Sequence, residues 1–457
     1  MKRILSYTII CFATLFCVCC ETEYYSADSP TSLSFATDTL SFDTVFTGSA
    51  TTTTYLALYN RSDNDILIDR IWLNGGDDSP FNININGTNA TSVESIRLQG
   101  RDSLWIFVNV YPNETTEDTP FVVEDVVSVS SGSCVVTSRL LAYAQNVVRV
   151  NSESVGGQKW DSQRPYLLSG VNVVDSTQIL TISEGTQIYF EEDATLQVYG
   201  TLVAIGSQDK KIVFRGKRTD DFYDDIPGQW KSLTFMPGSL DNYISYAEIA
   251  GAEYAVEVDS ASTLELENVV VRDASYGAIL AYGANISIVN SLLYNCGGPL
   301  LAAYGGKTSV IHCTMSNYYS WEIRRKPTLF ITKGERYPDY QGLLIANSII
   351  VGNMTDEVDI DSLPDDETLI SHSYIKMSKK RYKAEDVRFE AVRIGGTPYF
   401  VNRDKYDFHL MEKSEAINAA YPSYSEMYPY DYEGKSRLSD LCPDMGAIET
   451  LLQEKTK

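Results

Sequence analysis

Histidine is scarce in this chain, with three residues among 457. Imidazole is the side chain that most often transfers protons near neutral pH, so this scarcity argues against a Ser-His-Asp triad and a multi-histidine metal site. His312 and His372 fall in a repeated column described below, and His409 lies in the short motif "DFHL". The sequence therefore predicts no catalytic residue and no metal ligand.

Cysteine pairs with metal-binding or redox spacing are also missing. Four of the eight cysteines lie within the first twenty residues, and the others form no C-x-x-C pair: Cys134, Cys296, Cys313 and Cys442. This pattern disfavours a zinc knuckle and a thioredoxin-like site. Cys296 and Cys313 also fall five positions apart around the repeat, which is a poor geometry for a disulfide.

Basic residues are outnumbered, with 37 Lys and Arg against 61 Asp and Glu, and the formal net charge is -24. An acidic surface of this kind repels phosphate backbones, so we expect no nucleic-acid partner. The length of 457 residues and the 44% of hydrophobic residues are typical of a folded chain with two or more domains.

A long apolar run occurs only at the start of the chain. Residues 1–20 place Lys2 and Arg3 before an apolar stretch that is too short for a membrane span, which is typical of an export signal. The stretch ends at Cys20 and resembles the lipobox of bacterial lipoproteins, in which this cysteine becomes the lipid-attachment residue. Cys17 or Cys19 is an alternative acceptor, and an ordinary cleaved signal is the other interpretation. No later segment is apolar enough to cross a bilayer.

Two acidic residues, Glu21 and Glu23, follow Cys20. They resemble the short acidic signal that directs Bacteroidetes lipoproteins to the cell surface. This resemblance implies a protein that is anchored by lipid in the outer membrane and exposed outside the cell. A periplasmic orientation is the alternative.

Residues 30–150 alternate apolar and polar side chains in short runs such as "TTYLALYN" and "SLWIFVNVYP", separated by turn-forming residues. This alternation predicts the antiparallel strands of a β-sandwich. The landmarks "FDTVFTG", "LALYNRSDNDILI", "PF" and "LQGRDSLWIFVNVYP" resemble the immunoglobulin-like modules of the abnormal-spindle and hydin type. The resemblance implies an Ig-like β-sandwich that serves as a spacer or an interaction module.

A fixed period appears in the second half of the chain. One column of the repeat advances by 22 residues three times, then by 35 and by 25: Tyr246, Asn268, Asn290, His312, Asn347 and His372. Short Val-, Ile- and Leu-rich runs at this period predict a β-solenoid over residues 165–390. We expect the column to lie at a bend, with its Asn and His side chains forming a hydrogen-bonded ladder. This pattern resembles the asparagine ladder of the right-handed parallel β-helix family, which includes pectate lyases.

Residues 391–457 carry a separate set of motifs, "PYFVN", "DFHL", "SEAIN", "DYEGKSR" and "DMGAIE". Together they resemble the C-terminal segment sometimes called the choice-of-anchor Q domain. Because an open solenoid end exposes apolar core and strand edges, we expect this segment to cap the β-helix. The predicted fold is all-β: an N-terminal Ig-like β-sandwich, a right-handed parallel β-helix and a C-terminal cap.

The long step between His312 and Asn347 predicts an insertion that forms a loop on one flank, residues 320–342. This loop gathers basic and aromatic side chains in an otherwise acidic chain: Trp321, Arg324, Arg325, Lys326, Lys333 and Arg336. Guanidinium groups pair with carboxylates and aromatic rings stack on sugars, so the loop is a candidate site for an acidic glycan. The alternative is that its charges pair with neighbouring acidic coils.

Two tyrosines, Tyr282 and Tyr304, lie one period apart and predict an aromatic stack. The stack is a candidate sugar platform or a case of lateral packing. Two acidic segments are also present: residues 355–368 lack the defined ligand spacing of a Ca²⁺ site, and residues 220–225 lie near Trp230 without defining an acid–base pair. We therefore expect no cofactor, with Ca²⁺ as the one alternative.

The lipid anchor, the missing catalytic residues and the basic aromatic loop together predict a function. We expect a cell-surface lipoprotein that binds a polysaccharide or cell-surface glycan, or mediates adhesion, through the flank of the β-helix. One alternative is a polysaccharide lyase or glycoside hydrolase that acts on acidic polysaccharide. The other is a structural envelope protein without a small ligand.

Overall fold

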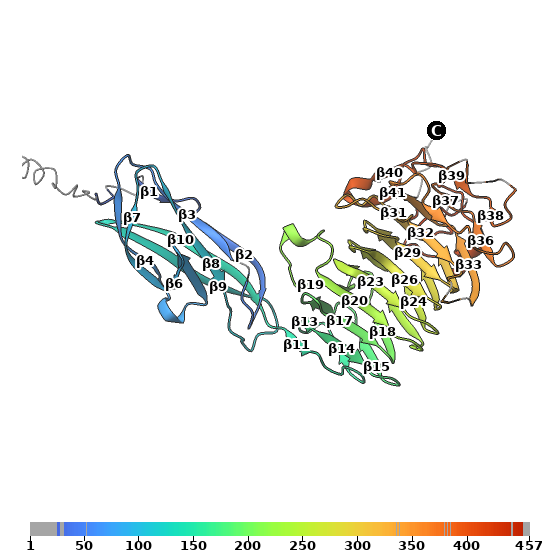
Figure 1. The fold of residues 1–457 in the computed structure, drawn as a ribbon, viewed down its shortest axis with the longest axis horizontal. Helices are drawn as coiled ribbons and strands as arrows, with labels where there is room; N and C mark the ends of the chain where they lie inside the picture. The colour runs from blue at the N-terminus through green and yellow to red at the C-terminus, as the bar shows by residue number, and fades with distance from the viewer. Residues whose placement is uncertain are drawn as a thin grey trace, which may run out of the picture. The chain divides into compact units, whose positions relative to one another are not determined.

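The computed structural model describes residues 25–27, 32–51, 53–334, 336–337, 339–378, 380–381, 383, 385–439 and 442–450. The predicted export signal and Cys20 lie outside the described residues. The chain is nearly all β, with 49% strand and 3% helix, as the alternating patterns predicted (Figure 1). It divides into two compact units, one ending at Asn146 and the other beginning at Val147.

The first unit is a sandwich of two five-stranded sheets that share one apolar core. One sheet has the order β1 (Leu33–Phe35), β3 (Thr54–Asn60), β8 (Ser103–Val110), β5 (Phe81–Ile85) and β6 (Thr88–Ala90). The other has the order β2 (Thr39–Phe46), β10 (Cys134–Gln145), β9 (Phe121–Ser131), β4 (Ile66–Leu73) and β7 (Ser92–Leu98). Neighbours are antiparallel except β2 and β10, and strands such as β8 alternate buried and exposed side chains, as expected for sheets with one face in the core.

The second unit is a parallel β-helix, in which most coils contribute one strand to each of three sheets, while the first and last coils have no strand in sheet II. Sheet I contains β11 (Val148–Asn151), β13 (Tyr166–Ser169), β16 (Gln187–Phe190), β19 (Ile212–Gly216), β22 (Ala247–Ala250), β25 (Val270–Arg272), β28 (Leu292–Tyr294), β31 (Thr314–Asn317), β34 (Ile349–Gly352), β37 (Tyr374–Ile375) and β39 (Arg393–Ile394). Sheet II contains β14 (Val171–Val174), β17 (Thr195–Val198), β20 (Trp230–Phe235), β23 (Ala252–Val258), β26 (Gly277–Tyr282), β29 (Leu301–Tyr304), β32 (Leu329–Thr332) and β35 (Val358–Asp359). Sheet III contains β12 (Lys159–Trp160), β15 (Ile179–Ile182), β18 (Thr201–Ile205), β21 (Asn242–Ser245), β24 (Thr263–Glu267), β27 (Asn285–Val289), β30 (Gly306–Ile311), β33 (Tyr340–Ala346), β36 (Thr368–Ser371) and β38 (Phe389–Glu390). The parallel strands thus begin at Val148, before the expected residue 165.

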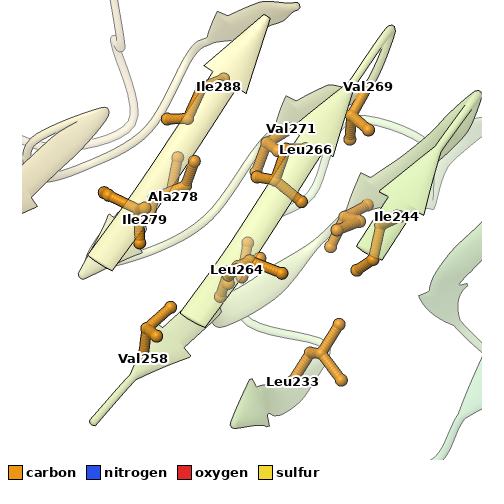
Figure 2. Packing of buried hydrophobic residues seen from close by; sticks show 14 of the residues in the cluster. Leu233, Ile244, Val258, Leu264, Leu266, Val269, Val271, Ala278, Ile279 and Ile288 are labelled. Carbon is orange, nitrogen blue, oxygen red and sulfur yellow. The ribbon is translucent and has the colours of Figure 1, made fainter. Parts of the chain in front are cut away.

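The interior of the β-helix is filled by aliphatic side chains from all three sheets. Figure 2 shows Leu233, Val258, Leu264 and Ile279 from neighbouring strands packed against one another in this core. Each is fully or almost fully buried, and burying one such side chain stabilises the fold by about 1.5–3 kcal/mol. A single coil would leave these side chains in water, so the coils are stable only when stacked.

The repeated column lies at the corner between sheet III and sheet I, where one or two residues separate the strands. Its members all adopt left-handed backbone conformations, with φ of 46°, 54°, 49°, 53°, 52° and 43° for Tyr246, Asn268, Asn290, His312, Asn347 and His372. Asparagine tolerates this conformation better than most residues, because its short polar side chain bonds locally. The backbone corner therefore explains why asparagine recurs at this position.

The predicted side-chain ladder is only partly present along this column. Asn347 Nδ2 lies 3.1 Å from His312 Nε2. A more regular ladder is formed by the residue that follows the corner, where the Ser348 hydroxyl accepts a hydrogen bond from the backbone N–H of Cys313 at 3.1 Å and Ser373 does the same for Ser348. The coil-to-coil hydrogen bonds expected of the Asn and His column are thus made mostly by the serine that follows it.

The C-terminal segment lies along the side of the β-helix, which corrects the expectation that it caps the open end. Its strands β40 (Phe400–Asn402) and β41 (Asp407–Leu410) and the short helix α2 (Pro422–Met427) precede a run of turns. Its apolar side chains, including Phe408, Met445 and Ala447, pack on outward residues of sheet I such as Leu292 and Ile349. Those outward residues are apolar over several coils, and the C-terminal segment shields them from water.

Candidate functional site

The predicted insertion is not one loop. It contains a regular strand, β32, and therefore divides into two segments: residues 318–328 between β31 and β32, and residues 333–339 between β32 and β33. The corresponding connections one coil earlier are residues 295–300 and the single residue 305. The basic and aromatic side chains of the insertion are therefore distributed between the two edges of sheet II.

Arg324 is not available to a ligand, which corrects its assignment as a glycan-binding residue. Its side chain is buried, and Nη2 lies 2.6 Å from Oε1 of Glu357, which is also buried. The same guanidinium donates to Oδ1 of Asn353 at 2.8 and 3.0 Å. Here the alternative of charge pairing holds, because Arg324 ties residues 318–328 to the next coil.

The other predicted side chains of the insertion are exposed. Trp321 is 55% exposed and Arg325 is exposed, and Lys326 Nζ lies 4.0 Å from the ring centroid of Phe330. At the opposite edge of sheet II, Lys333 and Arg336 are exposed. These side chains therefore flank sheet II on its two edges.

Tyr282 and Tyr304 form the predicted stack on sheet II, with ring centroids 5.3 Å apart and ring planes within 9°. Tyr337 packs on Tyr282 at 5.9 Å, and Phe330 packs edge-on against Tyr304 at 5.8 Å. Stacked rings cover one another's faces, so lateral packing explains this pair better than a sugar platform does. Burial also raises the pKa of Tyr282 to about 12, so its hydroxyl stays protonated.

A second column, at the corner between sheet I and sheet II, was not predicted. Gly251, Asp273, Asn295 and Asn317 follow one another at steps of 22, and the first three have positive φ. Asn295 Nδ2 donates to Oδ1 of Asp273 at 2.5 Å, and Asn317 Oδ1 accepts from the backbone N–H of Cys296 at 3.1 Å. The same 22-residue alignment that revealed the first column contains this signal.

Arg272 and Asp273 form a buried ion pair beside this column, with Nη1 and Oδ2 2.5 Å apart. Arg272 also contacts Glu248 at 2.7 Å and reaches Asp224 and Asp225 of the connection between β19 and β20, at 3.5 and 3.3 Å. Burial raises the pKa of Asp273 to about 6 against the opposing effect of Arg272. Asp224 and Asp225, considered above as possible acid–base groups, thus contribute to a network around Arg272.

A pocket of about 200 Å³ opens between this column and the C-terminal segment. Its lining combines hydroxyl, amide, guanidinium and aromatic groups: Asn295, Ser316, Tyr318, Ser320, Arg403, Asp404, Tyr406 and Phe408. The guanidinium carbon of Arg403 lies 4.3 Å from the ring centroid of Tyr318, and Tyr406 accepts a hydrogen bond from Asn295 at 3.0 Å. Ser320 is followed directly by the exposed Trp321.

Ser316 is the unusual member of this lining. It is 3% exposed, and its hydroxyl oxygen has no hydrogen-bond partner among the described residues. A buried polar group without a partner costs about 1–3 kcal/mol, so a ligand hydroxyl that reached Ser316 would recover this loss. The pocket is smaller than the roughly 300–1,000 Å³ of sites for drug-sized ligands, so it suits one sugar ring.

Some acidic side chains of residues 355–368 form ion pairs within the β-helix unit. Glu357 holds Arg324, and Asp359 pairs with Arg381 at 3.2 Å. Within the described part of the chain, no group of three or more His, Cys, Asp and Glu side chains is arranged to hold a metal ion. None of the helices formed by the described residues is long and apolar enough to cross a membrane.

Comparison with known proteins does not identify a family. No family model matches the sequence, and no curated protein matches it. Among solved structures, a family 123 glycoside hydrolase from Clostridium perfringens is 8% identical with a TM-score of 0.18, over 24% of this chain and 26% of the hydrolase chain. The YadV chaperone is 15% identical with a TM-score of 0.17, over 25% of this chain and 52% of its own. Scores this low carry no argument about fold or activity.

Proposed function

We propose that this protein is a lipid-anchored protein of the outer cell surface that binds acidic glycans through the flank of its β-helix. The observation that supports this best is the polar pocket between the second column and the C-terminal segment. Its side chains match the groups of an acidic sugar: hydroxyls and amides for the ring hydroxyls, and Arg403 for a carboxylate.

Arg403 can exchange its present partner for a ligand. It pairs with the neighbouring Asp404 at 2.7 Å, and both side chains are substantially exposed. Exposed ion pairs of this kind contribute only about 0–1 kcal/mol, so a bidentate sugar carboxylate would compete well. Tyr318 lines the same pocket, and the exposed Trp321 directly follows the lining residue Ser320, so its ring is a candidate platform for a further sugar unit.

Binding is favoured over hydrolysis by the number of carboxylates in this pocket. A glycosidase generally needs two carboxyl groups that flank the scissile bond, about 5–9.5 Å apart. Asp404 is the one carboxylate among the described residues that line the pocket. The Asp273 carboxylate accepts a hydrogen bond from Asn295, but it is fully buried and paired with Arg272, so it does not line the pocket.

Replacing Arg403 with glutamine should weaken the retention of uronate-containing polysaccharides about tenfold. A hydrogen bond to a charged group contributes about 1.5–3 kcal/mol, and 1.4 kcal/mol corresponds to a factor of ten. The measurement is the dissociation constant of the full chain on immobilised polysaccharides at several salt concentrations. The matched control is Arg70→Gln, because Arg70 also lies over an aromatic ring, that of Trp72 in the other unit, at 5.3 Å. Equal losses in both variants, or none in either, would contradict the assignment of the pocket.

The anchor is tested separately by replacing Cys20 with serine. A cysteine that carries several acyl chains holds a protein on a membrane far more firmly than a chain without lipid does. The Cys20→Ser variant should therefore appear in the soluble fraction. The measurement is fractionation combined with incorporation of labelled fatty acid. Cys19→Ser is the control and should remain labelled. Unchanged labelling of Cys20→Ser would move the acceptor to Cys17 or Cys19.

A further inference from the structure

The N-terminal sandwich presents an aromatic surface on one of its two outer faces. Tyr55, Trp105 and Phe107 project outward from β3 and β8, and each is more than 40% exposed. Tyr55 is paired in register with Phe107, and its ring centroid lies 4.3 Å from that of Trp105. Three large rings thus lie together on adjacent strands.

Side-chain amides border these rings on the next strand. Asn84 of β5 is in register with Phe107, and Asn82 is in register with Asn109 of β8. Asn82 Nδ2 donates to Oδ1 of Asn109 at 3.3 Å, which leaves the Asn82 oxygen and the Asn109 nitrogen for a ligand. Asn84 already donates to Asn89 at 2.6 Å and accepts from the Gly87 N–H at 3.1 Å, so it offers only its second N–H and second lone pair. Rings and amides are therefore arranged side by side on three central strands.

The charge of this face differs from that of the opposite face. The outward residues of β3, β8 and β5 include no charged side chain: Tyr55, Ala57, Tyr59, Ser103, Trp105, Phe107, Asn109, Asn82 and Asn84. The other sheet carries Arg139 paired with Glu124 and Arg70 bonded to Ser92 on its outer side. One charged side chain borders the face: the guanidinium carbon of Arg61 lies 5.2 Å from the ring centroid of Tyr59. The part of the face that contains Tyr55, Trp105 and Phe107 carries no charged side chain of its own, so it complements an uncharged ligand.

We propose that this face, formed by Tyr55, Trp105, Phe107, Asn82, Asn84 and Asn109, is a binding site for a neutral polysaccharide chain. The rings stack on the apolar faces of pyranose units, and the amides bond their hydroxyls. Cross-strand aromatic pairs also stabilise a sheet by about 0.2–1 kcal/mol, but that role does not require the rings to remain exposed. This site is independent of the pocket on the β-helix and takes a different class of glycan.

The test measures the binding of the full chain to immobilised neutral polysaccharides, namely a β-glucan, a mannan and a xylan, beside a uronate-containing polysaccharide. Trp105→Thr keeps a strand-favouring residue in β8 and should weaken neutral-glycan binding about tenfold or more, whereas Trp105→Phe should retain most of it. Binding should vary little with salt, because no charge takes part. Unfolding midpoints of the variants establish that the sandwich remains folded.

Tyr143→Ala is the matched control, because Tyr143 is 46% exposed, as is Trp105, but lies on the opposite sheet. It should leave neutral-glycan binding unchanged. Three outcomes would overturn the proposal: no retention on any of the neutral polysaccharides, equal binding by Trp105→Thr and the wild type, or self-association that Trp105→Thr abolishes without polysaccharide binding. Loss of acidic-glycan binding in Arg403→Gln would leave this proposal intact, so the two sites fail separately.

Discussion

Replacing Arg437 with methionine should lower the free energy of unfolding of the β-helix unit by about 3–5 kcal/mol at pH 8. Arg437 is fully buried between the C-terminal segment and the first column. Its guanidinium lies 3.2 Å from Glu449, and it donates to Oδ1 of Asn290 at 3.2 Å and to the carbonyl of Ala447 at 3.0 Å. Methionine would leave the Glu449 carboxylate buried without its cation.

The loss should depend on pH in a definite direction. Burial and the nearby Asp444 carboxylate raise the pKa of Glu449 to about 8, while Arg437 opposes this shift. A carboxyl group with a raised pKa in the folded state is favoured there in its protonated form, so stability falls as the pH rises through that pKa. Without Arg437 the pKa of Glu449 rises further, and the variant should lose most stability in alkaline solution.

Urea unfolding followed by circular dichroism at pH 6 and pH 9 measures both effects. The double variant Arg437→Met, Glu449→Gln should recover part of the stability and flatten the pH dependence, since it removes the unpaired carboxylate. Arg393→Met is the control, because Arg393 is exposed and should change stability by no more than about 0.5 kcal/mol. A loss in Arg437→Met no larger than in the control would show that the C-terminal segment is not held by this ion pair.

Replacing Arg324 with methionine should release residues 318–328 from the side of the β-helix. The Glu357 carboxylate also accepts bonds from the Thr328 N–H and hydroxyl, at 2.9 and 2.7 Å, and from the Met354 N–H at 2.6 Å. Removing one partner of a buried ion pair costs about 3–5 kcal/mol, and here the cost falls on the segment that Arg324 holds. Because Tyr318 and Ser320 line the pocket, acidic-glycan binding should weaken as well.

Amide hydrogen exchange and limited proteolysis over residues 318–328 measure this release. Arg325→Met is a matched control, because Arg325 is the adjacent residue, is exposed, and should leave protection in the segment unchanged. Protection that is equal in both variants would mean that the insertion is held by its apolar contacts rather than by the ion pair.

The repeat illustrates how far sequence reasoning reaches. The spacing of Asn268, Asn290 and His312 predicted a stack of coils, and the structure places these residues at one corner of successive coils. The spacing could not show which property selects them, because a ladder of side chains and a left-handed backbone both favour asparagine. The structure shows that every member has positive φ, while the regular hydrogen bonds come from the serines that follow Asn290, Asn347 and His372.

The insertion illustrates where sequence reasoning stopped. The 13 extra residues predict one loop, because an alignment of repeats collects all additions in one gap. The short strand β32, "LFIT", carries too little pattern to reveal that the additions lie on both sides of it. Arg324 and Arg325 are neighbours with the same chemistry, yet one is buried and the other exposed.

The sequence alone determined that the second unit is a stack of parallel coils, because each coil must bury its apolar residues against the next and this requirement repeats along the chain. Only the tertiary structure decided what covers the sides of the stack. The C-terminal segment lies on sheet I, and Arg437 joins it to Asn290, which is 147 residues away. Such contacts depend on the outer shape of the folded coils, and side chains so distant in sequence leave no local pattern that predicts their pairing.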